Sequence, residues 1–363
     1  MTELDLKLDR IKDLLAKHGA NAVLLQQIST FAWATCGASS YINVATNNGV
    51  GSLLITPTSR YLITNNIEEP RFEQEEQLAA QGWEFRIAPW YETNEAVAKL
   101  TRGMKLAADG SYPGAIDLSH DFAHLRANLM PEEGERFRAL SRLCACAMNS
   151  AIHAIRPGMT EFEIAAILNQ ETQTRGVLPI VNLIATDERI FNYRHPLPTD
   201  KSMDKYAMLV LSGRKWGLVC SLTRLVHFGA LSSQLRCRMQ VLAKIDATFI
   251  AATRPGKNLG EIFRQATDAY KETGYPTEWQ LHHQGGPAAY ESRECVATPT
   301  SNDVVNVGQV YAWNPSITGT KSEDTILIGP QGNEVMTEIV GWPTLPIEIN
   351  GQVIKRPAIL EVV

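Results

Sequence analysis

The 363-residue sequence contains no long apolar run, no CxxC motif and no basic stretch. Without an apolar segment of about 20 residues, no membrane-spanning helix is expected. The charged, helix-periodic segment 1–19 lacks the apolar run of a signal peptide. The net charge of −5 is spread along the chain, with no basic stripe for nucleic acid and no membrane anchor. These absences predict a cytoplasmic protein that acts on a small molecule or a peptide.

The cysteines also lack the spacing of a metal or redox motif. Cys144 and Cys146 lie two residues apart, so on a helix their side chains would point to different faces. We therefore expect buried, reduced thiols rather than a functional site. The six residues are Cys36, Cys144, Cys146, Cys220, Cys237 and Cys295.

The composition, with 44% hydrophobic and 20% charged residues, is typical of a globular protein long enough for two domains. An opening helix, strands at 22–27 and 50–64 and a helix at 68–82 predict a small α/β domain over residues 1–130. The segment 131–155 begins with Pro and acidic residues and then places apolar residues at helical spacing. A second domain is therefore expected to begin near residue 131.

The second part of the chain, residues 131–363, contains an internal repeat. IHAIRPGMTEFEI (152–164) aligns without gaps with IAATRPGKNLGEI (250–262), and Gly176 and Gly274 keep the same offset. Chance similarity of two helix starts is the alternative, because the first copy carries a common capping-box pattern. The number of identities in register favours two helix–turn–helix halves that face a shared sheet. Short β-branched runs bounded by Gly or Pro predict its strands at 206–213, 217–229, 307–317 and 323–329.

The chain resembles the pita-bread superfamily of methionine aminopeptidase, aminopeptidase P, prolidase and creatinase. Residues 9–37 are similar to the opening of the creatinase-type N-terminal domain, and residues 155–164 to the start of the catalytic domain. The motifs RHPLPTD, GLVCSLTR, HHQGG, WNPSI and SEDT follow the family's site motifs in order. The resemblance covers nearly the whole chain. It implies an α+β pita-bread domain with a pseudo-two-fold repeat over 131–363, a smaller creatinase-type α/β domain over 1–130, and a homodimer.

The metal ligands of the family are mostly replaced. Its peptidases hold two divalent ions with two Asp, one His and two Glu. The resemblance places Leu211 and Ser221 at the two Asp positions and Asn314 at the first Glu position, while His283 and Glu323 are retained. Two such ligands are too few for a tightly bound catalytic zinc ion. The resemblance with these departures therefore implies no metal and no cofactor.

Two histidines keep positions that could work without a metal. His195 matches the residue that acts as acid and base in creatinase, a metal-free hydrolase, and an imidazole with a pKa of about 6.5 exchanges protons without a metal. A loop histidine beside prolines is the alternative. His283 would hydrogen-bond the polarised centre together with Tyr290, which replaces the family's second histidine. A purely structural histidine is the other interpretation of His283.

Glu323 would be a carboxylate on a buried strand without a metal to neutralise it. Such a group must raise its pKa or find a partner, and Lys321, Arg293 and the two histidines are candidates. It either orients water or a cationic substrate group, or belongs to a structural ion-pair network.

The residues together favour a metal-independent, creatinase-like hydrolase that cleaves a C–N or related bond. Arg293, Lys321 and Arg194 make the local charge neutral or positive, so we expect a small polar substrate with an anionic group. The alternatives are a catalytically silent pita-bread protein that binds a ligand or a partner, and an Xaa-Pro aminopeptidase or dipeptidase. The predicted catalytic residues are His195, His283 and Glu323. The predicted substrate-binding residues are Tyr290, Asn314, Arg293, Lys321, Ser221 and Arg194.

Overall fold

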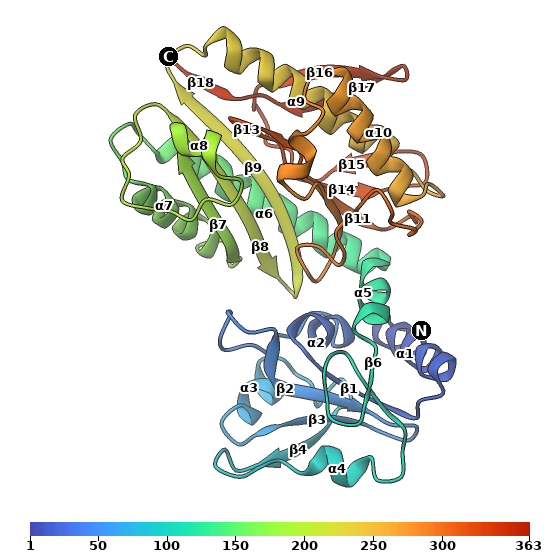
Figure 1. Cartoon of the computed structure of the whole chain (residues 1–363). Coiled ribbons are helices and arrows are strands. Elements are labelled where there is room, and N and C mark those ends of the chain that lie inside the picture. Colours follow the sequence, from blue (N-terminus) through green and yellow to red (C-terminus); the bar gives the residue numbers. More distant parts are fainter. The chain divides into compact units, whose positions relative to one another are not determined.

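The computed structural model describes residues 1–363 and contains two compact units (Figure 1). The first comprises Met1–Ala127 together with Trp216–Leu218, and the second comprises Asn128–Lys215 and Val219–Val363. The division lies within a few residues of the predicted boundary at residue 130. None of the helices combines the length and the apolar character that a membrane span requires.

The first unit is built on a six-stranded sheet in the order β4-β3-β2-β1-β5-β6. The pairs β1/β2 and β2/β3 are antiparallel, whereas β1/β5, β3/β4 and β5/β6 are parallel. Side chains of β1, β2, β3 and β5 form one core cluster. The elements are α1 (Glu3–His18), β1 (Ala22–Gln27), α2 (Ile28–Ala34), β2 (Asn48–Ile55), β3 (Arg60–Asn65), α3 (Glu69–Gln74), β4 (Glu84–Ala88), α4 (Ala96–Leu100), β5 (Leu106–Ala108), β6 (Ile116–Asp117) and α5 (Ser119–Ala127).

Two expectations for this unit were wrong in detail. The predicted strand 50–64 is a hairpin, because Thr56 and Ser59 form a turn: the backbone N–H of Thr56 donates to the carbonyl of Ser59 at 2.9 Å. The predicted helix 68–82 is shortened to α3. Gln77 adopts a φ of 53°, in the left-handed region that does not continue a right-handed helix. Turn geometry therefore divides runs that look continuous in composition.

The second unit contains the sheets β18-β9-β8-β7 and β10-β11-β14-β15 and the two-stranded pairs β12-β13 and β16-β17. The backbone N–H of Thr223 donates to the carbonyl of Glu323 at 3.1 Å, which links β9 to the start of β14. The elements are α6 (Pro131–Ala154), α7 (Glu161–Gln173), β7 (Leu178–Thr186), α8 (Glu188–Asn192), β8 (Tyr206–Lys215), β9 (Leu218–Phe228), α9 (Ser233–Ala252), α10 (Leu259–Glu272), the 3-10 helix η1 (Glu278–Leu281), β10 (Gly285–Ala288), β11 (Val310–Trp313), β12 (Ser316–Ile317), β13 (Thr320–Lys321), β14 (Asp324–Ile328), β15 (Asn333–Val335), β16 (Thr344–Ile349), β17 (Gln352–Pro357) and β18 (Leu360–Val362).

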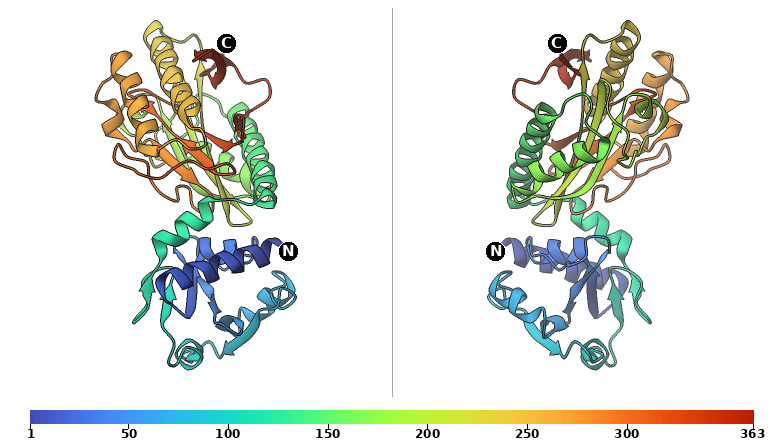
Figure 2. Two further views of the ribbon diagram at one scale, coloured as in Figure 1. Left: turned by 90° about the vertical axis from the view of Figure 1, so that its right-hand side faces the viewer. Right: turned by 90° about the vertical axis from the view of Figure 1, so that its left-hand side faces the viewer.

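The predicted repeat is confirmed in the helix pairs α6–α7 and α9–α10. Thr160 and Asn258 occupy equivalent N-cap positions of α7 and α10, and each side chain accepts the backbone N–H three residues later. Two residues before each cap, Gly158 and Gly256 have φ of 93° and 80°, which favours glycine. In both views of Figure 2, the green and the yellow-to-orange helices lie on opposite sides of the strands.

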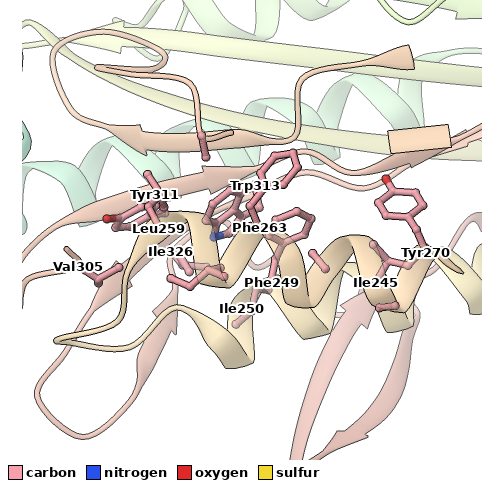
Figure 3. Close-up of a cluster of buried hydrophobic side chains, with 14 of the residues drawn as sticks. Ile245, Phe249, Ile250, Leu259, Phe263, Tyr270, Val305, Tyr311, Trp313 and Ile326 are labelled. Carbon is pink, nitrogen blue, oxygen red and sulfur yellow. The ribbon is translucent and has the colours of Figure 1, made fainter. Parts of the chain in front are cut away.

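The second helix pair packs on the second sheet through a large aromatic and aliphatic core (Figure 3). Phe249 of α9 stacks on Trp313 of β11, with ring centroids 4.5 Å apart. The indole N–H of Trp313 donates to Thr253 Oγ1 at 3.0 Å, so its polar atom is satisfied inside the core. This packing holds β11 and β14, which carry site residues at their ends.

The four predicted strands of the second unit are present as β8, β9, β11 with β12, and β14. Asn314 and Pro315 separate β11 from β12, because proline cannot donate to a ladder. All six cysteines are free. Cys144 and Cys220 are buried as expected, whereas Cys146 and Cys237 are exposed, so the expectation of buried thiols was wrong for those two.

Candidate functional site

A cavity of about 470 Å³ in the second unit brings together six of the nine predicted site residues. The six are His195, His283, Arg293, Asn314, Lys321 and Glu323. Apolar side chains line another part of the same cavity, namely Val181, Leu183, Leu197, Val210 and Val296. Ser212, Glu291 and Ser292 complete the lining. The cavity therefore offers one charged region and one apolar region to a ligand.

These residues come from both halves of the repeat. His195 lies in the loop after α8, and Ser212 lies on β8. His283 lies two residues before β10, Lys321 is the last residue of β13, and Glu323 is the residue before β14. Segments about a hundred residues apart are thus joined at the cavity by the pairing of Thr223 with Glu323.

Glu323 lies in an ion-pair cluster at the cavity. Its carboxylate accepts hydrogen bonds from Thr223 Oγ1 at 2.7 Å and Arg293 Nη2 at 2.9 Å, and Lys321 Nζ lies 3.4 Å away. Burial alone would raise the pKa of Glu323, but Lys321, Arg293 and the hydrogen bonds outweigh burial and bring the pKa to about 2. Burial lowers the pKa of Lys321 more than Glu323 raises it. At neutral pH one carboxylate therefore faces two basic side chains.

Three histidines meet beside this cluster, and one of them, His282, was not predicted as a site residue. His282 Nε2 lies 2.9 Å from His195 Nε2, and the ring centroids of His282 and His283 are 4.5 Å apart. Burial lowers the pKa of His282 to about 2, that of His283 to about 4, and also that of His195. All three rings are therefore neutral at pH 7. The sequence signal for His282 was the adjacent histidine pair.

The residue that faces Ser221 differs from the one that the resemblance placed at the first Asp position. The resemblance placed Leu211 at the first Asp position, but Leu211 is fully buried and does not line the cavity. Ser212 lines it instead, and Ser212 Oγ lies 2.8 Å from Ser221 Oγ. Successive side chains on a strand point to opposite faces, so a shift of one residue exchanges the two. Ser212, a residue that sequence reasoning missed, therefore faces Ser221.

Three predicted substrate-binding residues do not line the cavity. Tyr290 is fully buried, and its hydroxyl donates to Glu133 Oε1 at 2.6 Å. Arg194 forms an ion pair with Glu278 and donates to Thr318 Oγ1 at 3.2 Å. The Oγ of Ser221 is hydrogen-bonded to Ser212, which lines the cavity, whereas Ser221 itself does not. These side chains have protein partners in place of the predicted substrate contact.

The sequence model described as Metallopeptidase family M24 matches residues 135–330, which is more than half of the chain. The chain belongs to metallopeptidase family M24. A relative described as an uncharacterized peptidase of Staphylococcus haemolyticus is 23% identical over 233 residues, covering 61% of this chain and 65% of the relative. The match thus spans slightly less than two thirds of that relative's length.

Solved structures show the same fold over nearly the full length. The Xaa-Pro dipeptidase from Bacillus anthracis has a TM-score of 0.81 at 18% identity, covering 99% of this chain and 100% of that chain. The prolidase from Pyrococcus horikoshii OT3 has a TM-score of 0.78 at 20% identity, covering 92% and 98%. The N-terminal domain of FACT complex subunit SPT16 from Cicer arietinum has a TM-score of 0.67 at 13% identity, covering 93% and 96%. The pita-bread architecture with a preceding α/β domain is thereby confirmed.

The residues at the cavity do not fit a pair of divalent metal ions of the kind that the resemblance implies. Ser212, Ser221 and Asn314 supply neutral oxygens where carboxylates would be required, so only His283 and Glu323 remain from that set. Glu323 is already bound by two basic side chains, and Lys321 Nζ lies against its second oxygen. Positive charges at this position oppose a second cation at the same carboxylate. We derive no reaction step through such a metal pair.

Proposed function

We propose that this member of the family is a metal-independent hydrolase that cleaves a C–N or related bond of a small polar substrate with an anionic group. The observation that carries the proposal is the convergence of His195, His283, Asn314 and the Arg293–Glu323–Lys321 cluster in one cavity. A general base, hydrogen-bonding groups and a charged anchor are thereby within reach of a single bound molecule.

The charge balance of the cluster supports an anionic substrate group. Arg293 and Lys321 place two basic side chains beside the single carboxylate of Glu323, and all three side chains are nearly buried. The Nε of Arg293 is buried and has no hydrogen-bond partner. A carboxylate or phosphate group on the ligand would give Arg293 a further partner, and guanidinium groups bind such anions well. The apolar wall would contact the rest of the molecule.

In this proposal His195 is the general base and then the general acid. Its imidazole, released from the 2.9 Å contact with His282, would take a proton from water as the water oxygen bonds to the substrate carbon. It would return that proton to the leaving nitrogen as the C–N bond breaks. His283 and Asn314 would hydrogen-bond the polarised oxygen. Glu323 would hold the two basic groups in position. Tyr290, predicted for the polarised centre, has no part in this scheme because it bonds Glu133.

The experiment is a hydrolysis screen of metal-depleted protein against matched anionic, neutral and cationic amides and amidines. Turnover of anionic compounds without added metal is expected. His195→Gln should lower turnover by about 10²–10⁴-fold while leaving the thermal midpoint unchanged, since His195 lies in a loop. Turnover that requires added metal, or that survives in His195→Gln, would contradict the proposal.

Arg293→Met tests the anion contact separately. The variant should raise KM for the anionic substrate and abolish its thermal stabilisation by anionic compounds. Arg194→Met is the matched control, because Arg194 binds Glu278 outside the cavity. Stabilisation by cationic compounds alone, unchanged in Arg293→Met, would show that the charge argument is wrong.

A second candidate is a catalytically silent protein that uses the same cavity to bind a ligand, or its surface to bind a partner. It is favoured by the ion pairs of Glu323 with Arg293 and Lys321, which engage the carboxylate that was predicted to orient water. Ligand binding without turnover in the screen would support it. The Xaa-Pro dipeptidase activity named for a structural relative would require metals that these residues do not fit. We also propose that the protein is cytoplasmic and forms a homodimer. Light scattering of the purified chain would test the dimer.

A further inference from the structure

The three histidines at the cavity form a second kind of site, distinct from the metal pair discussed above. One candidate ligand nitrogen each from His195, His282 and His283 lies within 4.8 Å of the others. We propose that this cluster binds a single transition-metal ion of the Zn²⁺, Co²⁺, Ni²⁺ or Cu²⁺ class. The proposal rests on this geometry and does not depend on the proposed hydrolase activity.

The distances suit imidazoles arranged around one ion. Zinc–nitrogen bonds of about 2.0–2.1 Å place two ligand nitrogens about 2.9–3.4 Å apart for angles between a right angle and a tetrahedral one. The Nε2 atoms of His195 and His282 are 2.9 Å apart. The ring centroids are 4.7 Å apart for His195 and His282, 5.6 Å for His195 and His283, and 4.5 Å for His282 and His283. The three rings are thus mutual neighbours, and small side-chain rotations would bring the third nitrogen to the same ion.

The nitrogen atoms are also chemically available. The Nδ1 atom of His283 is buried and has no hydrogen-bond partner, and the Nε2 atoms of His195 and His282 would exchange their contact with each other for the ion. Neutral imidazole is a ligand for zinc, copper and nickel, whereas magnesium and calcium prefer oxygen ligands. Three histidines leave one coordination position open, and His195 and His283 line the cavity, so that position would face the cavity.

Basic side chains near the three histidines oppose every divalent ion. Arg293 and Lys321 line the same cavity and lie against Glu323. Because this repulsion acts alike on all divalent ions, the ranking among them should follow imidazole affinity, with Cu²⁺ the strongest and Co²⁺ the weakest of the four. A site of this kind binds more weakly than a four-ligand structural zinc site.

Metal binding would have a consequence for the proposed activity. The lone pair of His195 Nε2 cannot both hold an ion and accept a proton from water. An ion in this site should therefore inhibit any reaction in which His195 is the base, in contrast to the activation that a catalytic metal produces.

The test measures binding directly and needs no substrate. A second histidine pair must first be removed, because His120 and His124 on α5 have Nε2 atoms 3.3 Å apart at the surface and could also bind an ion. In the His120→Asn/His124→Asn background, metal-stripped protein is titrated with Co²⁺ while visible absorption is followed. Zinc content is measured by elemental analysis after dialysis. One ion per chain is expected.

Adding His282→Asn to that background should weaken the affinity at least about tenfold, and His195→Asn should do the same. His195 lies in a loop, so its variant keeps the test valid if the buried His282 variant does not fold, which circular dichroism would reveal. The proposal is overturned if the background protein binds no ion, in which case the 2.9 Å contact is a simple N–H···N hydrogen bond. It is equally overturned if both histidine variants bind as tightly as the background protein.

Discussion

Glu323 and Asp324 are neighbours in sequence and belong to two different clusters of buried ion pairs, which differ in their numbers of acidic and basic side chains. Glu323 pairs with Arg293 and Lys321, and all three line the cavity. Asp324, the next residue, accepts hydrogen bonds from Arg224 at 2.8 Å and from Arg356 at 2.6 Å. Successive side chains on an extended strand point to opposite faces, so the two carboxylates serve different regions.

The cluster around Asp324 is closed. Arg356 also donates to Asp246 Oδ2 at 2.7 Å, which ties β17 to α9 and β14. Two carboxylates and two guanidinium groups balance, and each side chain is at most 2% exposed. The cluster at the cavity has two basic side chains and one carboxylate. A balanced buried network needs no further partner, whereas an unbalanced one beside a cavity can be completed by a ligand.

The largest expected effect comes from breaking the closed network. Arg356→Met leaves Asp246 without a basic partner and Asp324 with Arg224 alone, and should lower the free energy of unfolding by about 3–5 kcal/mol. Arg293→Met should cost less, because Lys321 still pairs with Glu323. Urea denaturation of the two variants measures the difference. Equal losses would show that the two clusters have the same structural role.

The pH dependence of stability should have opposite signs in the two clusters. Interactions with Lys321 and Arg293 lower the pKa of Glu323 from 4.5 to about 2, so its contribution is present above pH 4.5 and is lost as the pH falls toward 2. Burial raises the pKa of Asp246 above its ordinary value of 3.8, so the folded state binds a proton at Asp246 more tightly than the unfolded state does. The stabilising contribution of protonated Asp246 is therefore full below pH 3.8 and is lost as the pH rises through the raised pKa.

Unfolding free energies of the wild type, Glu323→Gln and Asp246→Asn at several pH values measure these two contributions. The advantage of the wild type over Glu323→Gln should shrink on acidification. The stability of the wild type relative to Asp246→Asn should instead increase on acidification. Parallel pH profiles for the two comparisons would contradict the assigned shifts.

The smallest effect is expected just outside the cavity. Tyr290→Phe removes the 2.6 Å hydrogen bond to Glu133 and should cost about 1–2 kcal/mol of stability. Ligand affinity should not change, because Tyr290 does not line the cavity. Asn314→Ala, at the cavity, should weaken ligand binding instead. Thermal shift with a ligand from the screen compares them, and weaker binding by Tyr290→Phe would restore its predicted substrate role.

Local features of the sequence were sufficient for the two helix pairs and for β8, β9, β11 and β14 of the second unit, whereas β7, β10 and β15 to β18 were not predicted. The caps Thr160 and Asn258 and the glycines before them mark both helix pairs, because capping and positive φ depend on residues close together in the chain. Six of the nine predicted site residues lie at one cavity. The first unit was predicted less well, since the turn at Thr56–Ser59, which contains Pro57, divides the run that was predicted as one strand.

The sequence by itself determined the repeat and the family, because these depend on residue identity and spacing. Only the tertiary structure decided which side chains share the cavity. Ser212 rather than Leu211 faces Ser221, and His282 meets His195 across 87 positions of sequence. The physical reason is that strand alternation turns a shift of one residue into a change of face. Contacts between distant segments depend on how the two sheets pair, which no local pattern records.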